Sequence, residues 1–95
     1  MVVSDKIKSE YITLLELVKN EAKENSSILE YFNYLNGYKE NFVSDSNVLL
    51  KEDLKEFIRG ANRYSDEFAF SDKYYQLIRK TINTIYDILN DKDII

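Results

Sequence analysis

The chain contains no cysteine, no histidine and no proline among its 95 residues. Without cysteine there is no disulfide bond and no thiolate chemistry, and without cysteine and histidine the usual zinc, copper and haem sites are excluded. A general acid or base built on histidine is excluded as well. An enzyme that uses only carboxylates and magnesium is the remaining catalytic alternative, and no spacing supports it. We therefore predict no catalytic residue, no metal site and no cofactor.

Turn-forming residues are scarce as well, since Gly37 and Gly60 are the two glycines. A β-rich fold needs turn residues about every 8–12 positions, so this scarcity favours helices. The longest aliphatic run, Val48–Leu50, is far shorter than a membrane span of about 20 residues.

The formal net charge is -4, and both signs are interspersed along the chain. Residues 51–80 are near neutral while both ends are acidic. General affinity for nucleic acid needs a basic face that neutralises phosphates, so no nucleic-acid partner is expected. The first residues turn charged at Asp5 and lack an apolar run of signal-peptide length. The expected location is therefore the cytoplasm.

Four amphipathic segments with helical spacing make up the chain, which we predict to be one domain over residues 1–95. The predicted helices cover residues 5–24, 27–42, 47–65 and 71–91. Short loops between four such helices favour an all-α, antiparallel up-down-up-down four-helix bundle with a left-handed twist. The predicted core stripes are Ile7, Tyr11, Leu14, Val18 and Ala22; Ile28, Phe32, Leu35, Tyr38 and Phe42; Leu50, Leu54, Phe57, Ala61, Tyr64 and Phe68; and Tyr75, Ile78, Ile82, Ile85 and Leu89.

Local signals mark several helix ends. Ser27 and Glu30 have the spacing of a capping box, and Ser71 is the predicted N-cap of the last helix. Gly37 falls inside the second segment, where it marks close packing, a kink or an early helix end. Ile94 and Ile95 follow the last helix, either folded back onto the bundle or presented as an apolar tip.

A basic ridge runs along the third segment at four-residue spacing. It consists of Lys51, Lys55, Arg59 and Arg63. Two interpretations stay open. The first is a solvated face paired with Glu52 and Glu56, which is the more common situation on a helix surface. The second is contact with an acidic partner or an anionic membrane surface.

Aromatic residues exceed the needs of one small core, with eight tyrosines and five phenylalanines. Tyr31 and Tyr34, and likewise Tyr74 and Tyr75, cannot all face inward, so some tyrosine is expected at the surface, where Tyr and Arg are favoured in binding hot spots. Phe68 and Phe70 flank the last turn. They either cap the open end of the bundle or present an exposed apolar patch.

The segment from Leu49 to Leu89, LLKEDLKEFIRGANRYSDEFAFSDKYYQLIRKTINTIYDIL, resembles the enterocin A immunity family, the small immunity proteins of class II bacteriocin producers. The likeness lies in an apolar third helix, a short turn with aromatic residues and "FS", and a fourth helix of the YYQLIRKTINTIYDI type. Helix count and length extend the likeness loosely over the whole chain.

This resemblance implies a Gram-positive cytoplasmic four-helix bundle that protects its producer from a secreted pore-forming peptide, by binding and without catalysis. The implied partner is the membrane permease that serves as the bacteriocin receptor, with peripheral contact at the inner face of the membrane. Specificity in the family resides in the C-terminal half. The chain departs from many members in its acidity and its short C-terminal tail. Together with the basic ridge, the resemblance gives these candidate partner-binding residues: Arg59, Arg63, Phe68, Phe70, Tyr74, Arg79 and Lys80.

A second class of function remains open at this point, namely a structural or regulatory interaction bundle such as a homodimer or an antitoxin-like partner. A tight dimer that buries Tyr31 and Tyr34 would favour it, whereas the immunity reading favours a monomer.

Overall fold

The structure, a computed structural model, describes residues 5–43, 51–68 and 70–90, without the Lys51 side chain. These residues form five α-helices and two short 3₁₀ helices, with no strand among them, which confirms the all-helical prediction for this part of the chain. No helix in these ranges is both long and apolar enough to cross a bilayer. The elements are α1 (Asp5–Glu24), η1 (Ser26–Ile28), α2 (Leu29–Asn36), α3 (Lys39–Val43), α4 (Lys51–Tyr64), η2 (Ser65–Glu67) and α5 (Asp72–Asn90).

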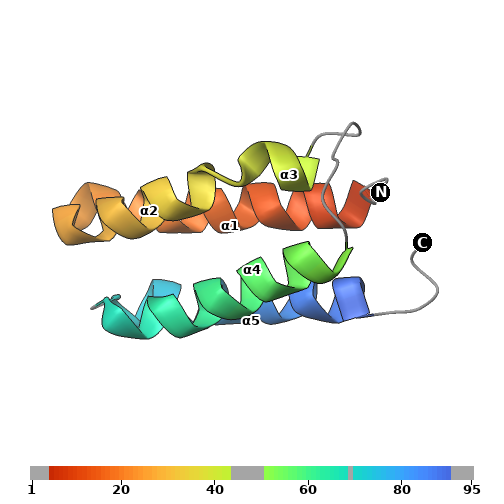
Figure 1. Ribbon diagram of the computed structural model, residues 1–95. Helices are drawn as coiled ribbons and strands as arrows, with labels where there is room; N and C mark the ends of the chain where they lie inside the picture. Colours follow the sequence, from red (N-terminus) through yellow and green to blue (C-terminus); the bar gives the residue numbers. More distant parts are fainter. Residues whose placement is uncertain (1–4, 44–50, 69, 91–95) are drawn as a thin grey trace.

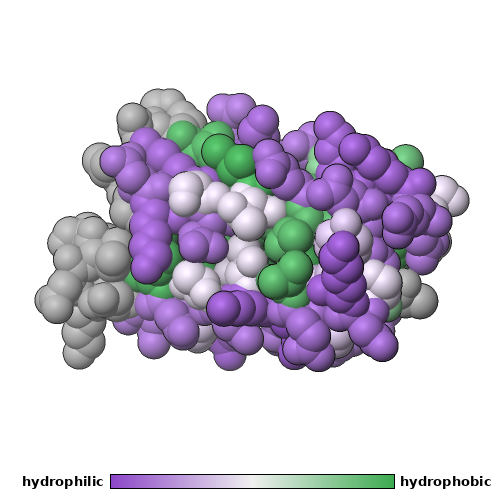
Figure 2. Space-filling model, turned by 180° about the vertical axis from the view of Figure 1, so that it is seen from behind, coloured by the Kyte–Doolittle hydropathy of each residue, from purple (hydrophilic) through white to green (hydrophobic). Residues whose placement is uncertain are grey.

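The helices form two layers, with α1, α2 and α3 above α4 and α5 in Figure 1. α2 and α3 return alongside α1, and α4 and α5 lie next to each other. The two layers are joined mainly by α1 against α5, the first and the last helix. Seen from the side of α1 and α5, the surface is mostly hydrophilic with separate hydrophobic patches (Figure 2).

The core lies between the layers and contains most of the predicted stripe residues. α1 has the predicted bounds, and α5 lies within one residue of them at each described end. Leu50, Ile94 and Ile95, and with them the predicted start of the third helix, lie outside the described residues. The stripe residues found buried are Ile7, Tyr11, Leu14, Val18, Ile28, Leu35, Phe42, Leu54, Phe57, Ala61, Ile78, Ile82, Ile85 and Leu89.

The predicted helix over residues 27–42 is wrong as a continuous element, because α2 ends at Asn36 and α3 begins at Lys39. The interruption centres on the carbonyl of Leu35. This carbonyl accepts a hydrogen bond from the Tyr38 amide at 3.1 Å, three residues further along the chain instead of the four of an α-helix. It also accepts a hydrogen bond from the Tyr11 hydroxyl of α1 at 2.6 Å. Of the three alternatives for Gly37, the structure has the early helix end, since Gly37 is the C-cap of α2, with ordinary helical dihedral angles. The tight turn at Tyr38 and the hydrogen bond from Tyr11 stabilise this interruption.

The face of α2 that enters the core also differs from the prediction. Tyr31 is fully buried, whereas the predicted stripe residue Phe32 is half-buried and Tyr38 is 37% exposed. Tyr38 instead stacks on Phe57 with a centroid separation of 3.8 Å. Tyr31 and Phe32 are adjacent aromatic residues, so periodicity alone does not show which of them enters the core. Tyr31 does, because its ring packs against aromatic rings of the other layer.

The predicted capping box of Ser27 and Glu30 is wrong. The Asn25 side chain is the cap, since its Oδ1 accepts the Ser27 amide at 3.2 Å and the Ser27 hydroxyl at 2.7 Å. The Glu30 carboxylate instead accepts the hydroxyl of Tyr64 at 3.3 Å, which ties α2 to α4. Asparagine and serine are both favoured N-caps, but Asn25 caps η1, so the helical segment begins at Ser26 and α2 itself begins at Leu29 without a side-chain cap.

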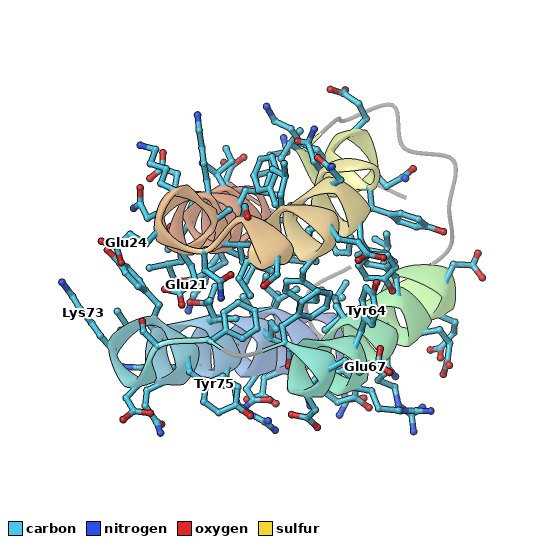
Figure 3. The ribbon with its side chains drawn as sticks, turned by 90° about the vertical axis from the view of Figure 1, so that its left-hand side faces the viewer. Glu21, Glu24, Tyr64, Glu67, Lys73 and Tyr75 are labelled. Carbon is cyan, nitrogen blue, oxygen red and sulfur yellow. The ribbon has the colours of Figure 1, made fainter. Side chains whose placement is uncertain are left out.

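A buried carboxylate fixes the start of α5. Glu21, at the end of α1, is only 3% exposed, and it accepts the Ser71 amide at 2.6 Å and the Ser71 hydroxyl at 2.9 Å. Figure 3 shows Glu21 pointing from α1 toward the first turn of α5. The Ser71 carbonyl accepts the Tyr75 amide, so Ser71 stands at the predicted N-cap position. Its hydroxyl, however, binds another helix.

Two fully buried tyrosines bond through their hydroxyls to main-chain carbonyls, Tyr11 to Leu35 and Tyr31 to Ala61 at 2.7 Å. Burial raises the pKa of both phenols above the ordinary value of 10.0, because a phenolate would lose its hydration. The neutral phenol therefore stabilises the folded state below pH 10, and this contribution is lost as the pH rises, since the unfolded chain ionises first.

We expect the free energy of unfolding to fall by about 1.4 kcal/mol per buried tyrosine between pH 9 and pH 11. Urea unfolding at each pH, followed by circular dichroism, measures this change. Tyr11→Phe and Tyr31→Phe should each flatten the pH dependence by one such step. A slope unchanged in both variants would contradict the assignment.

Candidate functional site

The predicted partner-binding residues lie on α4, η2 and α5, and the structure brings only some of them together. Arg79 is the centre of a group that joins η2 to α5, which we call the corner cluster: Asp66, Tyr75 and Arg79. The Arg79 Nη1 atom donates to the Tyr75 hydroxyl at 2.6 Å and to Asp66 Oδ1 at 3.0 Å. The Tyr75 hydroxyl donates to the same Asp66 oxygen at 3.1 Å.

The corner cluster holds the guanidinium of Arg79 in one place. The hydrogen bond to the Tyr75 hydroxyl, and after it the electrostatic interactions with Tyr75 and Asp66, raise the pKa of Arg79, which is charged at any ordinary pH. The guanidinium carbon also lies 5.4 Å from the centre of the Tyr75 ring, within cation–π range. The other N–H groups of Arg79 make no hydrogen bond to any described residue. A fixed arginine with free donors suits the recognition of a carboxylate or a carbonyl group.

Tyr75 was predicted as a core residue, and its role in the corner cluster was missed. Its ring is half-buried and lies 6.0 Å from Phe70, while its hydroxyl faces the charged groups at the surface. Figure 3 places Tyr75 on the side of α5 that faces away from α1 and α2. The signal in the sequence was the spacing of Tyr75 and Arg79, which are four residues apart on one helix and therefore neighbours on its surface.

Phe68 and Phe70 lie behind the corner cluster and are both half-buried. They belong to the aromatic cluster, in which Tyr31 is the central ring and contacts Tyr34, Tyr64, Phe68 and Phe70 at centroid distances of 6.2, 5.7, 5.3 and 5.6 Å. Of the two interpretations of Phe68 and Phe70, the structure supports the cap on the end of the core. Phe70 contacts Tyr75 of the corner cluster, and Phe68 packs against Phe70, so the aromatic cluster adjoins the corner cluster.

The remaining predicted residues occupy separate places. Tyr74 is half-buried against the core, and Arg59 pairs with Glu56 at 2.9 Å on the outer face of α4. Arg63 and Lys80 are exposed and have no ion pair with any residue that the structure describes. Among the predicted residues, these two side chains are therefore the most accessible to an acidic partner.

The basic ridge of α4 is mostly a solvated surface whose cations pair with Glu52 and Glu56, which is the first of the two interpretations given above. Lys55 lies 3.6 Å from Glu52 and donates to Asn90 Oδ1 at 3.0 Å, so it links α4 to the end of α5. With Arg59 paired as well, Arg63 is the ridge residue left for a partner. The side chain of Lys51 lies outside the described residues.

A shallow hollow of about 210 Å³ lies between α4 and α5, lined in part by Ile58, Arg59, Asn62 and Tyr86. The Oδ1 atom of Asn62 is buried and has no hydrogen-bond partner among the described residues. Within residues 5–43, 51–68 and 70–90, no group of three or more acidic side chains is placed to hold a metal ion.

A dimer that buries Tyr31 and Tyr34 between two copies does not fit the structure, because Tyr31 is already fully buried inside its own chain. Comparison of the chain with protein-family models, with curated proteins and with solved structures found no match. The geometry of the described residues is therefore the basis for a functional proposal, together with the resemblance in the C-terminal half.

Proposed function

We propose that this chain is an immunity protein of the enterocin A immunity type, which protects its cell from a pore-forming class II bacteriocin. It acts in the cytoplasm, by binding and without catalysis, at the inner side of the complex between bacteriocin and receptor permease. The observation that carries the proposal is the corner cluster with the aromatic cluster that adjoins it, a rigid site for Arg79 in the C-terminal half. Peripheral contact with the inner face of the membrane belongs to the same proposal.

The fold that goes with this function is an up-down-up-down, left-handed four-helix bundle in which α2 and α3 together count as one interrupted helix. The packing of α1 against α5 and of α4 against α5 supports it, as does the return of α2 and α3 alongside α1. In such a bundle the η2 turn is at one end, where it is accessible to a membrane-bound partner. The acting form is a monomer.

Arg79, Arg63 and Lys80 are the proposed contacts, with Tyr75 as the residue that positions Arg79. Arginine and tyrosine dominate binding hot spots, and a side chain already held in its bound geometry loses little entropy on binding. Phe68, Phe70 and Tyr74 contribute mainly by shaping this end of the core, since each is half-buried. Arg59, paired on α4, contributes least.

The test is a protection assay in a sensitive Gram-positive strain that expresses the protein, scored against a panel of class II peptides. We expect resistance to one peptide and not to the others. Arg79→Ala and Arg63→Ala should each reduce protection at least tenfold, the loss expected from one hot-spot contact of about 1.4 kcal/mol. Circular dichroism should show unchanged helicity, because exposed ion pairs stabilise a fold by only about 0.2–1 kcal/mol.

The matched control is Lys6→Ala, which removes one exposed charge from the first turn of α1. It should leave protection intact. Phe70→Ala is not informative here, because it would also remove a ring from the aromatic cluster. Absence of protection against every peptide, with folded and abundant protein, would overturn the proposal in favour of an interaction bundle of another kind.

A further inference from the structure

The outer surface of α1 and α2 contains a feature that the corner cluster does not explain. Two adjoining hollows of about 220 Å³ each lie between these helices, and they share Lys19 and Phe32 as lining residues. Leu29, which is 50% exposed, and Ile12, which is 43% exposed, are two of the four exposed large apolar side chains among the described residues.

 Ile12 lines one hollow and Leu29 lines the other, and the two hollows together form a groove along α1.

The rim of this groove is basic although the chain as a whole is acidic. Lys19, Lys23 and Lys39 line it, against Glu16 as the acidic lining residue. None of these three lysines has an ion pair with a described residue, whereas Lys55, Arg59 and Arg79 each have one. We call this surface the lysine groove, defined by Ile12, Leu29, Phe32, Lys19, Lys23 and Lys39.

From this arrangement we infer that the lysine groove is a docking site for an acidic amphipathic helix of a partner protein. The apolar face of such a helix would fill the two hollows over Phe32, and its carboxylates would meet the three lysines. The groove follows α1 from Ile12 to Lys23, about three helical turns or ~16 Å, which matches a short helix with apolar residues at i, i+4 and i+7.

The shape and the charge of the groove favour this occupant over two others. A bilayer surface is flat on this scale and has no protruding side chains, so it would leave the hollows unfilled. A second copy docked groove to groove would place the unpaired lysines of both copies against each other, and like charges in an interface are unfavourable. An acidic helix satisfies the apolar floor and the basic rim together.

The experiment uses the full chain and two fluorescein-labelled synthetic peptides. Both have leucines at helical i, i+4 and i+7 positions. One has glutamates at its other positions and the other has lysines there. By fluorescence anisotropy we expect the acidic peptide to bind at least tenfold more tightly than the basic one. Leu29→Ser, a change at a half-exposed side chain, should weaken the acidic peptide severalfold, because it removes part of the apolar contact.

Charge reversal separates the groove from the net charge of the protein. Lys19→Glu with Lys23→Glu should weaken binding of the acidic peptide at least tenfold. Lys6→Glu with Lys73→Glu also takes the net charge from -4 to -8, since each reversal removes two units, and should leave binding within about twofold. Equal loss in both double variants, equal binding of the two peptides or no binding of the acidic peptide would each overturn the proposal.

Two further arms address the other occupants. Vesicles of phosphatidylglycerol and phosphatidylcholine should bind the wild type and the Lys19 and Lys23 double variant equally, because membrane contact does not use the groove, and sedimentation should show the same monomer for both proteins. Vesicle binding that the double variant loses would replace the helix by an anionic membrane. A dimer that the variant loses would replace it by a second copy.

Discussion

Tyr31→Ala should destabilise the protein by about 3–5 kcal/mol, the range for removing a fully buried aromatic side chain. Tyr31 contacts four other rings and donates its hydroxyl to the Ala61 carbonyl. The cavity would open where α2 meets the α4–η2 corner, and the surrounding rings are too rigid to close it. Domains of this size have a total stability at the low end of about 5–15 kcal/mol, so much of the variant should be unfolded at 37 °C.

Urea unfolding followed by circular dichroism measures this loss of stability. Two further variants separate the contribution of the hydrogen bond from that of the buried ring. Tyr31→Phe removes only the hydrogen bond and should cost about 1 kcal/mol. Tyr38→Ala removes a ring that is 37% exposed and stacked on Phe57, and it should cost clearly less than Tyr31→Ala. If Tyr31→Ala costs no more than Tyr38→Ala, Tyr31 is not the centre of the aromatic cluster.

Glu21→Ala is expected to have the second largest effect, a loss of about 2–3 kcal/mol. The buried carboxylate receives two hydrogen bonds from Ser71, fifty positions away in the chain, and hydrogen bonds to charged groups contribute about 1.5–3 kcal/mol. The loss stays below the sum for two such bonds because Ser71 itself is exposed and its freed donors reach water. The start of α5 should loosen first.

Glu21→Gln tests whether geometry or charge matters at this position. The amide oxygen keeps the bond from the Ser71 amide, and the amide nitrogen donates to the Ser71 hydroxyl oxygen, so the loss should stay below about 1 kcal/mol. Glu24→Ala, an exposed carboxylate one turn further along α1, should change the free energy of unfolding by less than about 0.5 kcal/mol. Equal effects of Glu21→Ala and Glu24→Ala would show that the Ser71 bonds contribute nothing.

The helices that could be predicted well are those whose signals are local. α1 and α5 each have an apolar stripe that repeats for about four turns. The contact that α1 makes at the start of α5, between Glu21 and Ser71, falls on the N-cap that the sequence already predicts. The break after α2 was predicted only as one of three alternatives for Gly37, because the sequence does not show that the Tyr11 hydroxyl, from another helix, binds the Leu35 carbonyl there. The capping box failed for a similar reason, since Tyr64 engages Glu30.

The candidate site shows the same division. The resemblance and the positions of charge indicated Arg79. Its partner Asp66 depends on how η2 packs against α5, whereas Tyr75 was missed although it lies four residues away on the same helix. The ring of Tyr75 packs against the aromatic cluster, whereas its hydroxyl belongs to the corner cluster at the surface. A periodicity pattern that assigns each residue either to the core or to the surface predicts only the first of these roles. The lysine groove escaped prediction because its two exposed apolar residues, Ile12 and Leu29, lie outside the predicted stripes and belong to different helices.

The packing of the first helix against the last has a consequence for how the chain opens. If α5 detached alone, one side of α1 would be exposed to water along with the apolar side of α5 itself, and the Glu21 to Ser71 bonds would break. The free energy needed to detach α5 alone should therefore be nearly as large as the free energy of complete unfolding. The amide protons in the middle of α1 and α5 should consequently exchange with solvent through one shared, global opening, with nearly equal protection at the two ends of the sequence.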